Sequence, residues 1–199
     1  CLAFSLLSPA EVSPATTYNN LGVKYVERGE PEQAVRYFER AVREARGAQH
    51  RENLARALVA VGRADEAVRQ LRPLLAALEA EQQARPDPVG REELAEVAAL
   101  MAKALGQAGR GEQALSQLRE AIRRQPEDAE LRIQAGLCLV RLNQLPEALE
   151  QFEQAVRLEP DSATPHRLAG NVCYKLGRGG EALRHWRASL AAEPDNPKL

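Results

Sequence analysis

Apolar residues recur at helical spacing in paired segments along the chain, such as RIQAGLCLVRLN followed by PEALEQFEQAVRL. Intervals of three and four residues place such side chains on one side of an α-helix. A helix that stops and reverses needs a left-handed residue beyond its C-terminus, where Gly is favoured and Asn comes next. Such residues separate the paired segments at Gly29, Gly62, Gly109, Asn143 and Gly177. The pattern predicts a series of helix-turn-helix hairpins.

The hairpins repeat with a fixed period in the second half of the chain. Ala114, Ala148 and Ala182 lie 34 residues apart, and the prolines at 126, 160 and 194 keep the same spacing. The residue before a proline avoids the helical conformation, so these prolines are expected to end the second helix of each hairpin. A regular period of this length predicts stacked units, each of which contacts its neighbours.

Small residues mark the points where the two helices of each hairpin cross. Two helices approach to about 8–10 Å only where the crossing point lacks bulk. On the first helices these residues are Gly22, Ala55, Ala102, Gly136 and Gly170. Large apolar residues such as Phe38, Phe152 and Trp186 are expected to fill the space beside them.

This pattern of small and large residues resembles the tetratricopeptide repeat. The resemblance implies an all-α, right-handed α-solenoid of about five hairpins, over residues 15–47, 48–81, 95–128, 129–162 and 163–196. The first two units lack the closing proline, and Cys173 replaces a large residue in the fifth. The pentatricopeptide RNA-binding repeat has a similar period but is usually basic, unlike this chain.

An insertion interrupts the array between the second and third units. Ala67 and Ala114 are 47 residues apart, 13 more than the period, and RQLRPLLAALEAEQQA extends the helical pattern before RPDPVG breaks it. We expect an overlong helix and a loop at about 74–94, with Pro73 kinking the helix or leaving a carbonyl unpaired. The insertion is either a tolerated extension or a protruding helix that meets a partner or divides the array.

The charge balance and the side-chain inventory exclude several functions. The 27 Lys and Arg residues are matched by 28 Asp and Glu, so no net positive field favours nucleic acid. No apolar run reaches the roughly 18 residues of a membrane span. His50, His166 and His185 are expected to be isolated on different units, and no nucleophile pair, phosphate loop or metal-ligand spacing is recognisable. We therefore expect no enzyme, cofactor or metal site. Cys138 and Cys173 are expected to pack as small apolar residues, with a disulfide as the alternative.

The two ends of the chain support further expectations. Residues 1–14 are a leader remnant or a tether, and Cys1 resembles the lipidated first residue of a bacterial lipoprotein. Both interpretations imply export to the periplasm or the outer membrane, with membrane contact only through lipidation, whereas the alternative is a cytoplasmic fragment. Residues 197–199 form a tail. Leu183, Trp186 and Leu190 on the last hairpin are expected to be partly exposed, which favours self-association.

The resemblance also implies where a partner would bind. Tetratricopeptide proteins usually hold peptides or proteins on the concave surface lined by their first helices. The residues of this chain that fall on that surface are Arg56, Lys103, Ile133, Leu137, Arg141, Arg167, Asn171, Tyr174 and Lys175. Arg167, Asn171 and Lys175 are spaced at i, i+4 and i+8 beside Tyr174, an arrangement suited to a peptide carboxylate or an acidic side chain. A solvated helix face is the alternative.

The sequence thus predicts a non-catalytic scaffold that binds a protein or peptide, with acidic partners favoured. Two alternatives remain open. One is an exported or lipid-anchored bacterial factor that helps an outer-membrane or pilus complex assemble, and the other is an accessory domain of a larger enzyme.

Overall fold

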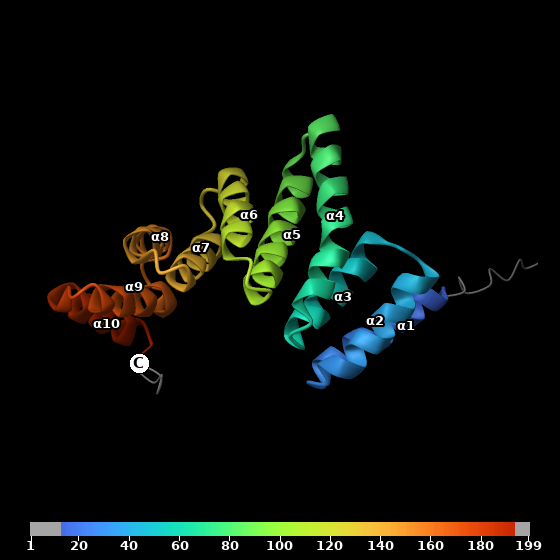
Figure 1. The fold of residues 1–199 in the computed structure, drawn as a ribbon, viewed down its shortest axis with the longest axis horizontal. Coiled ribbons are helices and arrows are strands. Elements are labelled where there is room, and N and C mark those ends of the chain that lie inside the picture. The colour runs from blue at the N-terminus through green and yellow to red at the C-terminus, as the bar shows by residue number, and fades with distance from the viewer. Residues whose placement is uncertain (1–12, 194–199) are drawn as a thin grey trace, which may run out of the picture. The chain divides into compact units, whose positions relative to one another are not determined.

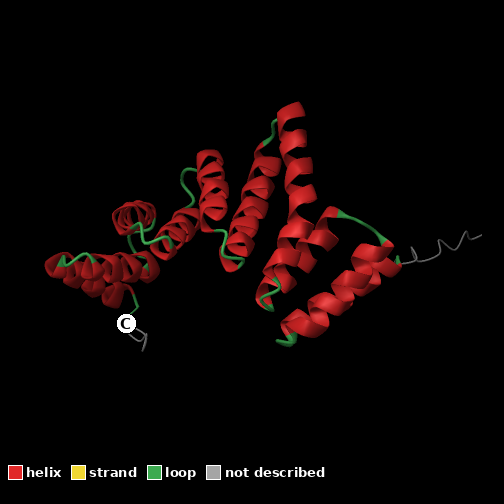
Figure 2. Ribbon diagram, in the orientation of Figure 1, coloured by secondary structure: helices red, strands yellow, loops and turns green. Residues whose placement is uncertain are grey.

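The structure is a computed structural model that describes residues 13–193, and within this range every regular element is an α-helix (Figure 2). Ten helices follow one another along these residues (Figure 1). They are α1 (Pro14–Glu27), α2 (Pro31–Glu44), α3 (Ala48–Ala60), α4 (Ala64–Ala84), α5 (Pro88–Gln107), α6 (Gly111–Arg124), α7 (Ala129–Arg141), α8 (Leu145–Leu158), α9 (Ala163–Lys175) and α10 (Gly179–Ala192). Taken in pairs they form five hairpins, which confirms the predicted all-α solenoid class.

The turns within the hairpins have the backbone conformation that their residues favour. The φ angles of the four turn glycines lie between 73° and 77°, and that of Asn143 is 60°. This left-handed residue lets the chain reverse while the helix end keeps a hydrogen bond, as when Gln144 N donates to Leu139 O at 2.9 Å. The positions of all five predicted turns are confirmed.

The chain divides into two compact units, Cys1–Gln70 and Leu71–Leu199. In the first, α1 packs against α2 and α2 against α3, and the start of α4 follows. In the second, each helix from α5 to α10 packs against the next, and α5 also contacts α7. The candidate site lies in the second unit.

Glycines bring the two helices of several hairpins into close contact. A Cβ atom added to Gly136 would lie 2.5 Å from Cε1 of Phe152, and one added to Gly22 would lie 2.5 Å from Cε1 of Phe38. Both phenylalanines are almost fully buried. The aromatic rings therefore fill the space that a side chain on the first helix would take, as the spacing of small and large residues predicted.

The insertion lengthens two helices and leaves only residues 85–87 between them. Helix α4 continues through Pro73 to Ala84, and α5 begins at Pro88. Asp87 caps α5, because its Oδ1 accepts a hydrogen bond from the backbone N–H of Gly90 at 2.8 Å. The expected loop to about residue 94 is therefore too long, since the Asp-Pro pair starts the next helix earlier than the repeat pattern suggested.

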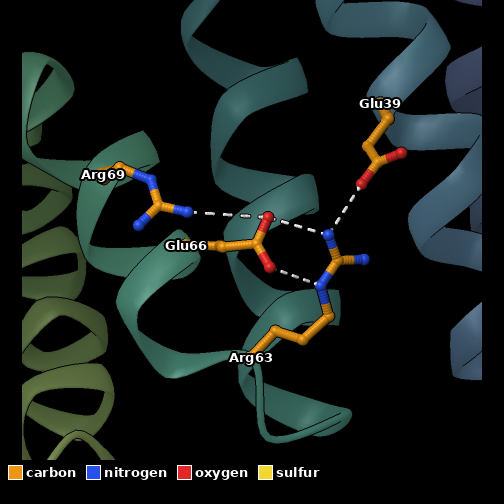
Figure 3. A network of polar contacts seen from close by, with 4 residues as sticks. All are labelled: Glu39, Arg63, Glu66 and Arg69. Atoms are coloured by element: carbon orange, nitrogen blue, oxygen red, sulfur yellow. Dashed lines mark hydrogen bonds and ion pairs between the residues drawn. The ribbon is translucent and has the colours of Figure 1, made fainter.

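A polar network joins the second hairpin to the first within the unit Cys1–Gln70. Figure 3 shows Arg63 between two carboxylates, with both Glu66 oxygens 2.7 Å from its nitrogens and Glu39 at 3.2 Å. The hydrogen bond from Arg63 lowers the pKa of Glu66. All three side chains are at least a third exposed, so the network fixes geometry more than it adds stability.

Candidate functional site

A hollow of about 210 Å³ lies between α5 and α7, and we refer to it as the α5–α7 hollow. It includes three residues that the sequence placed on the binding surface, Lys103, Leu137 and Arg141. The remaining lining residues are Ala102, Gly106, Leu118, Glu130, Gln134 and Cys138. The first helices of the third and fourth hairpins thus supply most of its surface.

Gly106 gives Arg141 room to lie over α5. A Cβ atom built on Gly106 would be 3.1 Å from Nη1 of Arg141, which is tighter than most contacts of real Cβ atoms. The residues one and two periods later are Val140 and Tyr174, so α5 lacks a side chain where the next two first helices carry one. The missing side chain hollows the surface and leaves room for the guanidinium there.

The hollow combines an apolar contact surface with two cations. Leu137 keeps 38% of its surface exposed although it sits inside a packed array. Lys103 and Arg141 are exposed, and neither forms an ion pair within residues 13–193. The one carboxylate in the lining, Glu130, accepts a hydrogen bond from Nε2 of Gln134 at 3.1 Å. The arrangement offers two donors to a negatively charged group beside an exposed leucine.

The cysteine beside the hollow is a packing residue. Cys138 is buried, its Sγ donates to the Gly111 carbonyl at 3.3 Å, and burial raises the pKa of its thiol. Cys173 is also buried with a raised pKa, and both thiols are free. A thiol whose pKa is raised by burial is a poor nucleophile. The predicted packing role of both cysteines is confirmed.

A second group of candidate residues surrounds Trp186 in the fifth hairpin. The indole Nε1 donates to Oδ1 of Asn171 at 3.1 Å, and the ring of Tyr174 lies 5.8 Å from that of Trp186. Because the indole only donates, it fixes the amide with its oxygen toward Trp186 and leaves Nδ2 as the free donor. Tyr174 is 68% exposed and covers one side of this cluster.

The remaining candidates lie outside the α5–α7 hollow. Arg167 and Lys175 lie on α9 beside Asn171, but neither lines the α5–α7 hollow. Arg56 lies in the other unit and pairs with Glu52 at 2.5 Å. A cation already paired to its own helix is less available to a partner. Cys1 lies outside the described residues.

The prediction for Ile133 is wrong. Its side chain is only 6% exposed and belongs to the core. Helix α7 contacts α5, α6 and α8, so more of its circumference is covered than the hairpin pattern alone indicates. Leu137, one turn further along, remains the apolar contact of this helix.

The five hairpins match a known repeat family. A family model described as tetratricopeptide repeat matches residues 14–199. The chain belongs to the tetratricopeptide repeat (TPR) family. No curated protein matches the sequence.

Several solved TPR structures have a similar fold. MamA from Desulfovibrio magneticus RS-1 superposes with a TM-score of 0.73 at 21% identity, covering 93% of this chain and 98% of that chain. YrrB, described as a TPR protein with an unusual peptide-binding site, superposes with a TM-score of 0.63 at 21% identity, covering 92% of this chain and 88% of that chain. At these identities the similarity concerns the TPR fold.

Two features of this TPR chain escaped the sequence analysis. Gly106 was not recognised as part of the site, although its place in the period, where Val140 and Tyr174 follow, could have indicated it. The expectation that the histidines are isolated on different units is wrong for His166 and His185. Nδ1 of His166 lies 3.2 Å from Nδ1 of His185, because their helices belong to one hairpin.

No helix within residues 13–193 is long and apolar enough to cross a membrane.

Proposed function

We propose that this TPR protein is a non-catalytic scaffold that holds an acidic segment of a partner protein in the α5–α7 hollow. The observation that carries the proposal is the placement of Lys103 and Arg141 beside the exposed Leu137, with no carboxylate of residues 13–193 paired to either cation. A bound segment would place an apolar side chain on Leu137 and a carboxylate between the two cations.

The similar structures support a peptide as the ligand of this hollow. TPR hairpins form open surfaces between adjacent first helices, and YrrB, which shares this fold, has a peptide-binding site. A peptide suits this hollow better than a small molecule does, because its volume of about 210 Å³ is below the range of roughly 300–1,000 Å³ typical of small-molecule pockets.

The expected affinity is modest and depends on salt. A hydrogen bond to a charged group contributes about 1.5–3 kcal/mol when it is shielded from water. Lys103 and Arg141 are exposed, so each contact should contribute nearer the 0–1 kcal/mol of surface ion pairs. Screening by salt should weaken these contacts further. Apolar contact with Leu137 would supply the part of the affinity that salt leaves unchanged.

The cluster around Trp186 extends the same proposal to the fifth hairpin. The fixed amide of Asn171 presents Nδ2, and Arg167 and Lys175 lie four residues before and after it on α9. A longer acidic segment could place a second carboxylate there.

The test measures the binding of defined peptides to four versions of the chain. The probes are two fluorescein-labelled peptides of equal length, one alternating Glu with Leu and the other alternating Lys with Leu. The variants are Lys103→Ala with Arg141→Ala, Arg167→Ala with Lys175→Ala, and the control Arg119→Ala with Arg187→Ala. The control removes the same charge from second helices, outside the hollow.

We expect the acidic peptide to bind the wild type and the control alike, and to bind the Lys103 and Arg141 variant about tenfold more weakly, equivalent to about 1.4 kcal/mol. The basic peptide should bind none of them. Equal affinity of the acidic peptide for all variants would contradict the proposal, as would stronger binding of the basic peptide.

We further propose that a second copy of the chain covers the exposed face of α10. Leu183 is 52% exposed, whereas Leu149 and Leu115, one and two periods earlier, are 4% and 2% exposed. Those two leucines lie in helices that contact a following hairpin, since α6 packs against α7 and α8 against α9. The face of α10 therefore continues the type of interface that holds the array together.

A further inference from the structure

The two histidines of the fifth hairpin occupy a pair of positions that recurs through the array. The positions lie 19 residues apart, one on each helix, and hold Arg51 with Gln70 in the second hairpin. There Nη1 of Arg51 donates to Oε1 of Gln70 at 3.5 Å. The pair thus bridges the two helices of a hairpin, and side chains other than histidine can do this.

The first histidine is also held by the loop before its helix. Nε2 of His166 lies 3.2 Å from the carbonyl oxygen of Pro160. In the fourth hairpin the equivalent Arg132 donates to the carbonyl of Pro126 at 2.7 Å. Because a carbonyl only accepts, the hydrogen of neutral His166 is on Nε2 and its Nδ1 carries a lone pair. That lone pair faces His185.

The distance between the two Nδ1 atoms fits a shared metal ion. Zinc binds imidazole nitrogen at about 2.0–2.1 Å, so two nitrogens on one tetrahedral ion are about 3.3 Å apart. The observed separation is 3.2 Å, and the rings are tilted by 46°. A histidine that binds a metal typically donates its other N–H to a carbonyl or carboxylate, as His166 does to Pro160.

We propose that Nδ1 of His166 and Nδ1 of His185 form a bidentate site for a divalent transition-metal ion of the zinc, nickel or copper class. Two imidazoles suit these ions and not Mg²⁺ or Ca²⁺, which prefer oxygen. Bound metal would link α9 to α10 and so stabilise the fifth hairpin. This is the hairpin in which α10 exposes Leu183 and Leu190.

The surroundings allow a cation to approach. Both rings are only half-buried, and the carboxylates of Glu153 and Glu181 act on His185, opposed by His166 and Arg184. Within residues 13–193 no group of three His, Cys, Asp or Glu side chains is arranged to hold a metal. The site therefore has two protein ligands, and water completes the coordination of the ion.

A hydrogen bond between the two rings is the competing explanation of the contact, and the repeat offers a control that separates the two. His166→Arg with His185→Gln installs Arg and Gln, the pair found at these positions in the second and fourth hairpins. This double variant should keep the bridge between the helices and the bond to the Pro160 carbonyl, yet lose both imidazoles. His50→Gln removes a histidine of the other unit and serves as the second control.

The experiment titrates Zn²⁺ into the full chain by isothermal calorimetry, with Mg²⁺ as the negative control, and follows the histidine ring resonances by NMR. We expect one Zn²⁺ to bind per chain in the wild type and in His50→Gln, with shifts confined to the His166 and His185 rings. Affinity should fall at least about tenfold in the double variant, because the loss of even an outer-shell partner costs 10–100-fold. Unchanged binding by a folded double variant would overturn the site, and so would the absence of saturable binding or of shifts in these two rings.

Discussion

The packing of Gly136 against Phe152 supports a quantitative test of how the hairpins close. Every first helix has a small residue at this place, and the residue 16 positions later is large. Glycine stands opposite an aromatic ring, as in Gly136 with Phe152, whereas Ala102 is followed by Leu118. The edge of the Phe152 ring and the methyl group that alanine would add at position 136 therefore compete for the same space. The change Gly136→Ala should destabilise the chain, and the added change Phe152→Leu should restore it.

The structure determines the size of each effect. An added Cβ would lie 2.5 Å, 2.8 Å and 2.9 Å from three atoms of the Phe152 ring, which is fully buried, so the ring or its packed neighbours must shift. Overpacking of this kind costs about 1–3 kcal/mol. Alanine recovers about 0.8–1.0 kcal/mol over glycine within a helix, so we expect Gly136→Ala to lose a net 0–2 kcal/mol, roughly. Phe152→Leu alone should lose about 1–2 kcal/mol through the space it leaves.

The double variant distinguishes this explanation from two independent losses. Its methyl group occupies part of the space that the ring leaves, so its stability should return to within about 1 kcal/mol of the wild type, with a coupling energy of about 1–3 kcal/mol. The assay is urea unfolding followed by far-ultraviolet circular dichroism, with a check that all four chains unfold with the same slope. If the losses of the two single variants simply add, Gly136 and Phe152 do not compete for space and the crossing geometry is wrong.

Three further outcomes are expected. Gly106→Ala should leave stability unchanged or raise it by up to about 1 kcal/mol. It should also displace the Arg141 guanidinium and weaken binding of the acidic peptide, and unchanged peptide affinity in fluorescence polarisation would contradict the role of Gly106. Leu183→Glu should shift the chain from dimer to monomer in analytical ultracentrifugation, whereas Leu137→Glu, a matched change on the α5–α7 hollow, should not, and equal dimerisation of both would place the interface elsewhere. Glu66→Gln should destabilise the chain by about 0–1 kcal/mol at neutral pH. The pKa of Glu66 is lowered in the folded chain by Arg63, so its contribution is present above the unfolded pKa of about 4.3 and is lost as pH falls through the lowered value. The melting temperatures of the wild type and Glu66→Gln should therefore converge in acid, and a constant difference would contradict this linkage.

The fold could be predicted because its determinants are local. The positive φ angles at Gly29 and Asn143 follow from the conformational preferences of these residues, without knowledge of the rest of the molecule. The contact between Gly136 and Phe152 could be predicted from the spacing of small and large residues on two adjoining helices. The length expected for the loop after α4 is wrong, since the capping bond of Asp87 decides where α5 begins and the repeat pattern gives no signal there.

The site could be predicted only in part, because helix periodicity indicates which side of a helix a residue lies on and not how much of that side its neighbours cover. Ile133 and Leu137 both lie on the predicted surface, yet one is 6% exposed and the other 38%. The difference depends on contacts of α7 with several helices at once. The space that the Arg141 guanidinium occupies depends likewise on a side chain that Gly106 lacks, and only a comparison with Val140 and Tyr174 at the same place in the period could have indicated it.

The repeat itself separates structural from functional demands. Each hairpin poses the same packing problem, so a residue that recurs at one position, such as the alanine at 114, 148 and 182, is explained by packing alone, and all three are at most 1% exposed. Packing alone does not explain a residue that differs from its equivalents in the other hairpins, when those hairpins form with other side chains at that position. Gly106 and the His166–His185 pair are such residues, because both lie outside the core and replace side chains that other hairpins use there without loss of the hairpin. These departures are therefore the places where the proposals for the α5–α7 hollow and for the metal site should be tested first.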